Sequence, residues 1–186
     1  MKVFEKTRAE VEAKLKMMSD FLKMEYLESC IKQNTGLDVR KFCNQQLADL
    51  YEKRSMFSEA AKNMSSVAEM AATFSEKIQS YMKETELWIK AAQYDRADEA
   101  FRKAMVSGNV RDKEEMKKAI LNLYKKQAEE YEKAKRNSNA LKIYEKLVEI
   151  SPETEKMAIR QKLLYFYKAL GKIREYTVLH GQLNKI

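Results

Sequence analysis

The sequence predicts an all-α protein built from helical hairpins, and its composition carries much of that prediction. Proline and glycine, which end or break helices, are scarce: the 186 residues include one proline and four glycines. Strong helix formers such as alanine, leucine, lysine, glutamate and methionine dominate the chain. Apolar residues make up 45 % of it, which is enough for a packed core, and they recur at helical spacing in several segments.

The clearest of these segments lies in the second half of the chain. A large, small, large triplet at spacings of four and three occupies one face of a predicted helix. A small, large, medium triplet with the same spacing follows on the next helix, and a proline comes five residues later. The residues of this copy are Tyr124, Ala128, Tyr131, Ala140, Tyr144, Leu147 and Pro152.

Three further segments share this pattern. Small residues let two antiparallel helices approach closely, while the aromatic residues fill the space between one hairpin and the next. Four copies in register predict a repeat more strongly than any single copy could. The other copies contain Ala48, Tyr51, Phe57, Ala60, Met64 and Val67; then Tyr81, Thr85, Trp88, Ala97, Phe101 and Ala104; and finally Leu164, Tyr167, Gly171, Ile173 and Tyr176.

This pattern resembles the tetratricopeptide repeat (TPR) over residues 38–184. The resemblance implies a right-handed superhelical solenoid of about four antiparallel helix hairpins. The equivalent aromatic residues are 37, 43 and 36 residues apart, longer than the roughly 34 of a TPR. That length also looks like the repeats of soluble attachment proteins, the vesicle-fusion adaptors, and a plain helical bundle is the remaining interpretation. The predicted hairpins are approximately 38–73, 75–107, 111–150 and 152–184.

Residues 1–33 precede the repeats and predict one long amphipathic helix. Val11, Leu15, Met18 and Leu22 follow a three-four spacing that gives the helix an apolar face. An apolar face of this size needs a covering partner. Either the helix caps the first hairpin, as solenoid ends require, or it pairs with a second copy and makes a homodimer.

The cysteines and the N-terminal residues predict a cytoplasmic protein. Cys30 and Cys43 are the two cysteines, which gives neither a disulfide framework nor a zinc pattern, and both are expected in the core. The first residues alternate charged with apolar side chains and lack the apolar centre of a signal peptide. No stretch approaches the roughly 18 apolar residues of a membrane span, so no transmembrane segment is expected.

Catalysis, metals and cofactors are not expected. His180 is the single histidine, so no histidine-based metal site or activated nucleophile can be assembled. The four glycines are isolated from each other, which excludes a glycine-rich phosphate loop. The acidic pairs stand in charged helical runs, where no burial is expected to shift their pKa values toward acid–base work.

The TPR resemblance implies a partner-binding groove lined by the first helix of each hairpin. We therefore expect a non-catalytic adaptor or scaffold that holds a peptide or a helical segment of a partner protein there. The surface is mixed, and Met82 and Ile89 are expected to be exposed among charged residues. By position the resemblance predicts as groove residues Gln45, Asp49, Met82, Glu86, Ile89, Lys125, Glu129, Gln161, Tyr165 and Lys168.

The charge distribution suggests an alternative function. Residues 1–100 carry a net charge of −1 and residues 101–186 carry +9, within a total of +8. A basic C-terminal half of this kind could bind nucleic acid or an anionic membrane surface. The candidate residues are interleaved with glutamates, so an ordinary solvated face explains them as well. They are Arg111, Lys113, Lys117, Lys118, Lys125, Lys126, Lys133, Lys135 and Arg136.

Overall fold

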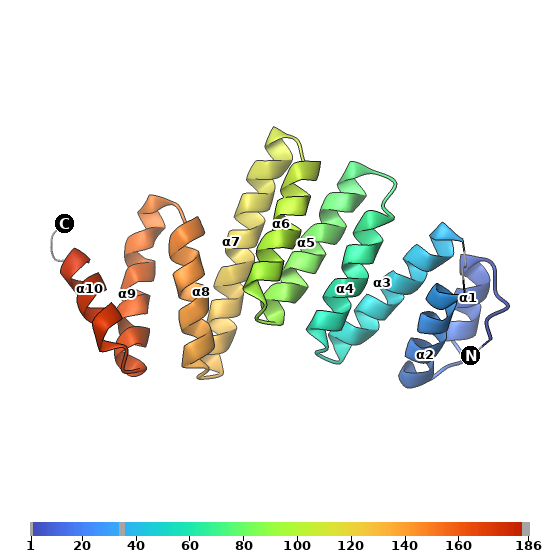
Figure 1. Ribbon diagram of the computed structural model, residues 1–186, viewed down its shortest axis with the longest axis horizontal. Coiled ribbons are helices and arrows are strands. Elements are labelled where there is room, and N and C mark those ends of the chain that lie inside the picture. The colour runs from blue at the N-terminus through green and yellow to red at the C-terminus, as the bar shows by residue number, and fades with distance from the viewer. Residues whose placement is uncertain (1, 34–35, 184–186) are drawn as a thin grey trace. The chain divides into compact units, whose positions relative to one another are not determined.

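The structure is a computed structural model that describes residues 2–33 and 36–183 (Figure 1). Over these ranges it contains ten α-helices and no strand, so the predicted all-α class is confirmed. Residues 1 and 184, the outer limits of the predicted N-terminal segment and of the last predicted hairpin, lie outside the described ranges. The helices are α1 (Arg8–Leu15), α2 (Asp20–Lys32), α3 (Leu37–Lys53), α4 (Phe57–Glu69), α5 (Phe74–Lys90), α6 (Tyr94–Ser107), α7 (Val110–Lys133), α8 (Asn137–Ile150), α9 (Glu153–Ala169) and α10 (Ile173–Leu183).

The chain divides into two compact units, Met1–Glu114 and Glu115–Ile186. The first unit holds α1 to α6 and the beginning of α7, and α5 packs between α4 and α6. The second holds the rest of α7 with α8, α9 and α10, and α9 packs against both α8 and α10. Each predicted hairpin interval contains two antiparallel helices in Figure 1.

Four turns inside these hairpins share one backbone geometry. In each, the second residue after the helix has a positive φ, the left-handed conformation that lets a helix end in a Schellman turn. Glycine adopts this conformation freely, whereas other residues pay a steric cost of roughly 1–2 kcal/mol. The four residues and their φ angles are Ser55 (58°), Ala92 (56°), Lys135 (54°) and Gly171 (70°).

The same four turns each form a backbone hydrogen bond with one of the four equivalent aromatic residues of the predicted repeats. In every turn the next backbone N–H donates to the carbonyl oxygen of the aromatic residue five positions earlier, which closes the Schellman ring. The four aligned aromatics therefore occupy one equivalent backbone position. The hydrogen bonds run from Met56 to Tyr51 (2.9 Å), Gln93 to Trp88 (3.0 Å), Arg136 to Tyr131 (2.9 Å) and Lys172 to Tyr167 (2.8 Å).

The N-terminal segment forms two helices, so the prediction of one long helix is wrong. α1 begins with a capping box in which Thr7 accepts from the N–H of Glu10, and it ends at Leu15. α2 begins at Asp20, and both helices pack on α3. The fold-back has a physical reason. A straight helix could not bring the buried side chains of both α1 and α2 to α3.

This packing is what an end cap requires. Val11, Tyr26 and Cys30 are fully buried, and the Tyr51 hydroxyl of α3 donates to Glu28 of α2 at 2.7 Å. Met17, Phe21 and Leu22, around the connection between α1 and α2, remain exposed. Capping and dimerisation therefore both stay predictions for this segment.

The apolar pattern of the last hairpin differs from the expected one. Leu164 and Tyr167 were expected to carry the apolar stripe of α9, but both are half-buried. Leu163 and Phe166 lie in the core instead, and the Phe166 ring stacks on Tyr144 of α8 with 5.4 Å between centroids. α10 packs on α9 but itself has no buried residue.

Candidate functional site

A network of opposite charges joins α3 to α5 in the first unit. The two carboxylate oxygens of Glu52 accept from Lys83 at 2.9 Å and from Lys90 at 2.7 Å. Glu86 pairs with the same two lysines, at 3.1 Å and 2.6 Å. The four side chains form a closed ring of alternating sign with no net charge. It links two helices that are not consecutive in the chain.

The lysines of this ring hold its two carboxylates in the charged form despite their partial burial. Burial by itself would raise the pKa of Glu52, but the hydrogen bonds and charges of Lys90 and Lys83 outweigh it and leave that pKa below its ordinary value. The same balance leaves the pKa of Glu86 lowered. The ring therefore stays charged at neutral pH, and it presents fixed donors and acceptors on the surface that α3 and α5 share.

The predicted groove residues of the first unit lie on or beside this surface. Gln45 and Asp49 of α3 are exposed, while Met82 and Glu86 of α5 are half-buried. Desolvation and the nearby Glu52 raise the pKa of Asp49, and Lys83 opposes that shift. A partner that approached this face would meet carboxylates, lysines and one methionine side chain.

Ile89 does not belong to the accessible surface, so its predicted exposure is wrong. It is 1 % exposed, and its neighbours Leu87 and Trp88 are buried as well. α5 packs against α4 and α6 and is tied to α3 by ion pairs. Contacts from three sides bury the face of α5 on which Ile89 lies, which no single-helix pattern could reveal.

Helices α7 and α9 are joined in a similar way in the second unit. Lys125 of α7 pairs with Glu155 of α9 at 2.7 Å, and Lys162 of α9 pairs with Glu132 of α7 at 2.9 Å. The Tyr144 hydroxyl of α8 also donates to Glu132. The first helices of neighbouring hairpins thus contact each other in both units.

The remaining predicted groove residues are accessible in the second unit. Glu129 of α7 is exposed, as are Gln161 and Lys168 of α9. Tyr165 is 63 % exposed, and its ring packs edge-on against Phe166 with 5.2 Å between centroids. This contact orients the Tyr165 ring on the surface of α9, where its phenol can meet a partner.

Sequence reasoning missed Glu52, Lys83 and Lys90 as parts of the surface. The spacing of Glu86 with Lys90 did signal an ion pair within one helix. Nothing in the linear pattern indicated the bridge from α5 to Glu52, because it depends on how two hairpins stack.

The basic residues proposed for the alternative function are partly accessible. Lys117, Lys118 and Lys126 are exposed along α7. Lys125 is paired with Glu155, which neutralises one cation of this series. The positive charge that α7 offers to a polyanion is therefore smaller than the number of its basic residues suggests.

No protein-family model, curated protein or solved structure gave a significant match to the chain. Within the described ranges, no group of three or more histidine, cysteine, aspartate or glutamate side chains is arranged to hold a metal ion. None of the helices that the structure describes has the length and apolarity needed to cross a membrane.

Proposed function

We propose that this chain is a non-catalytic adaptor of the cytoplasm, a TPR-like helical-repeat solenoid that holds a peptide or helical segment of a partner protein. The binding surface within each unit is the one formed by the first helices of its hairpins. The residue types in the sequence support the absence of catalysis and of cofactors in this proposal.

The observation that carries the proposal is the repetition of one hairpin geometry. Four Schellman turns occupy the same position relative to four aligned aromatic residues. First helices of successive hairpins are bridged by ion pairs, from α3 to α5 in one unit and from α7 to α9 in the other. Stacking of equivalent helices is the arrangement by which repeat proteins create extended binding surfaces.

The chemistry of this surface favours a polypeptide partner. The ring of Glu52, Lys83, Glu86 and Lys90 is neutral overall, so it offers directional hydrogen bonds rather than a strong field. Met82 adds an adaptable apolar contact at its side. Main-chain amides and mixed side chains of a peptide match such a surface better than a polyanion does.

A second candidate function rests on the exposed lysines of α7. Lys117, Lys118 and Lys126 could contact the phosphates of nucleic acid or of an anionic membrane. Binding of that kind falls steeply with salt, which separates it from binding on the neutral ring.

Site-specific photocrosslinking tests the adaptor proposal. A benzophenone amino acid is placed in turn at Gln45, Met82 and Tyr165, and the purified variants are irradiated in nuclease-treated cell extract. We expect the same partner protein to be crosslinked from several of these positions. Matched probes at Lys62 of α4 and Val178 of α10, which are exposed outside the first helices, should capture none of it.

Two outcomes would contradict the adaptor proposal. Equal crosslinking from Lys62 and Val178 would mean that capture is nonspecific. Loss of all binding after nuclease treatment, with recovery of nucleic acid that Lys117→Glu and Lys118→Glu abolish, would make the exposed lysines of α7 the functional surface.

A further inference from the structure

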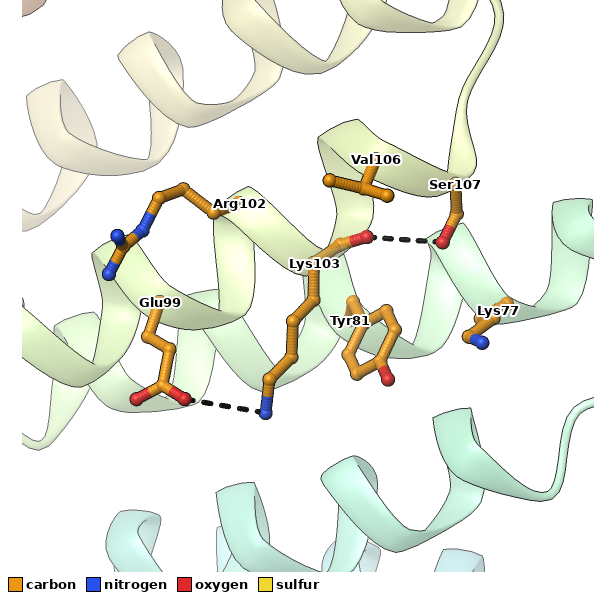
Figure 2. Close-up of a pocket in the computed structure, with 7 residues that line it drawn as sticks. All are labelled: Lys77, Tyr81, Glu99, Arg102, Lys103, Val106 and Ser107. Atoms are coloured by element: carbon orange, nitrogen blue, oxygen red, sulfur yellow. Dashed lines mark hydrogen bonds and ion pairs between the residues drawn. The ribbon is translucent and has the colours of Figure 1, made fainter.

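A second surface lies on the opposite side of α5 from the ion-paired ring. Tyr81 and Lys83 are two residues apart, so their side chains leave the helix about 200° apart. Tyr81 contributes to a solvent-open hollow of about 520 Å³ between α5 and α6 (Figure 2). We call this the α5–α6 hollow. Its lining includes Lys77, Tyr81, Glu99, Arg102, Lys103 and Val106.

Cations dominate the lining of the α5–α6 hollow. Figure 2 shows Lys77 and Lys103 on the two sides of the Tyr81 ring, and their ammonium nitrogens lie 6.0 Å and 5.9 Å from the ring centroid. The ring thus holds both cations by cation–π attraction. Arg102 is exposed beside them, whereas the carboxylate of Glu99 is committed to Lys103 at 3.6 Å. Three positive side chains face one negative one.

The Tyr81 ring between these cations is buried and uncharged. Its side chain is buried, and burial raises the pKa of Tyr81 above its ordinary value. Lys103 opposes the shift, while Glu69 and Glu84 add to it. The phenol therefore remains neutral at physiological pH, and the local positive charge is not cancelled by a phenolate.

Val106 lines the α5–α6 hollow, and Phe74 precedes Tyr81 by seven residues, which places these two aromatic residues on the same face of α5. Val106, near the end of α6, is 85 % exposed. Phe74, the first residue of α5, is 74 % exposed, and the antiparallel hairpin brings the start of α5 to the same end as the last turn of α6. An exposed phenylalanine and valine next to three cations and one carboxylate form a surface that is both apolar and basic.

We propose that the α5–α6 hollow binds an acidic segment of another protein that carries one bulky apolar side chain. Carboxylates of the segment pair with Lys77, Arg102 and Lys103, and its apolar side chain packs on Val106 and Phe74. The cations sit around a recessed ring, so extended acidic side chains reach them more readily than a flat lipid surface does. This site lies on the opposite side of α5 from the ring of Glu52, Lys83, Glu86 and Lys90 and does not depend on that ring.

A labelled peptide tests this proposal on the full-length protein. The probe is a short glutamate-rich peptide with one central phenylalanine, and its affinity is measured by fluorescence anisotropy. We expect Lys77→Glu combined with Arg102→Glu to weaken binding roughly tenfold or more, because attraction is replaced by repulsion. Val106→Ser should weaken it a few-fold, and so should replacing the phenylalanine of the peptide by alanine.

The matched control reverses the same number of charges elsewhere. Arg54→Glu with Lys62→Glu, at exposed positions of the α3–α4 turn and of α4, should change the affinity less than about twofold. Equal weakening by the two double variants would overturn the proposal, since it would reveal attraction by net charge alone. It is also overturned if an alanine-centred peptide binds equally well, or if vesicles of anionic phospholipid compete fully for the α5–α6 hollow. Circular dichroism of each variant verifies that its helices are intact, and crosslinking from Gln45 and Met82 reports separately on the first-helix surface.

Discussion

Hairpins α5–α6 and α9–α10 have the same turn but differ in how deeply they are buried. Their Schellman turns match in φ and in hydrogen bonding, at Ala92 in one hairpin and Gly171 in the other. Yet α6 buries Ala97, Ala100 and Ala104 completely or almost so, whereas α10 buries no residue. The turn is a local property, while burial depends on the neighbours that a hairpin has.

The second helices show this dependence most directly. The alanines of α6 lie against α5, which itself packs on α4. Within its unit α10 contacts α9, and its Ile173 and Val178 remain 64 % and 57 % exposed. A repeated sequence pattern can therefore specify hairpins of equal turn geometry and unequal burial.

The largest expected effect comes from truncating the aligned aromatic residues. Trp88→Ala should lower the free energy of unfolding of its hairpin by about 3–5 kcal/mol, as large aromatic truncations in cores do. It also deprives the buried Glu84 carboxylate of the indole N–H that donates to it at 3.1 Å. Tyr167→Ala removes a half-buried ring and should cost less than about 2 kcal/mol. Hydrogen exchange of α5 and α9 amides measures both losses, and equal losses would contradict the difference in burial.

Much of the fold could be predicted because it is encoded locally. The aromatic residues at Tyr51, Trp88, Tyr131 and Tyr167 were aligned from spacing alone, and the structure places them at equivalent turns. Helix termini follow from short-range chemistry of this kind. The break between α1 and α2 was missed because the apolar spacing continues across it, and the fold-back depends on packing against α3.

The candidate surface was less predictable, since accessibility is a property of the packed molecule. Tyr165 and Gln45 are exposed as expected, but Ile89 is buried by contacts around α5. The bridge from Glu52 to Lys90 joins residues 38 positions apart. The spacing of residues predicts which side chains share a helical face, but it does not predict which other helices pack against that face.

A smaller effect should come from the buried carboxylate that distinguishes α5 from α9. Desolvation raises the pKa of Glu84 despite the hydrogen bond from Trp88. The folded state therefore binds the proton more tightly than the unfolded one, so this group costs stability as the pH rises from about 4.5 through the folded pKa. Glu84→Gln should remove that cost and gain on the order of 1 kcal/mol at pH 7, with less gain at pH 4.

Urea unfolding of wild type and variant at both pH values measures this difference. The stabilising ion pairs of other carboxylates cancel when the variant is compared with the wild type at each pH. Glu175→Gln, at an exposed position of α10, is the matched control and should leave stability unchanged at both. A loss of stability in Glu84→Gln at pH 7 would mean that the charged form is favoured in the core.

The smallest effects should be equal and opposite at the two turns. Ala92→Gly removes the steric strain of a Cβ atom in the left-handed conformation and should stabilise α5–α6 by about 0.5–1 kcal/mol. Gly171→Ala introduces the same strain and should destabilise α9–α10 by a similar amount. Ala91→Gly is the control: its φ of −75° is helical, so the same substitution one position earlier should destabilise. Hydrogen exchange of the hairpin amides measures the stability of each hairpin in the three variants, and thermal unfolding compares their Tm values. If Ala92→Gly and Ala91→Gly shifted stability in the same direction, the positive φ at residue 92 would not govern the turn, and the shared geometry of the hairpins would lose its energetic basis.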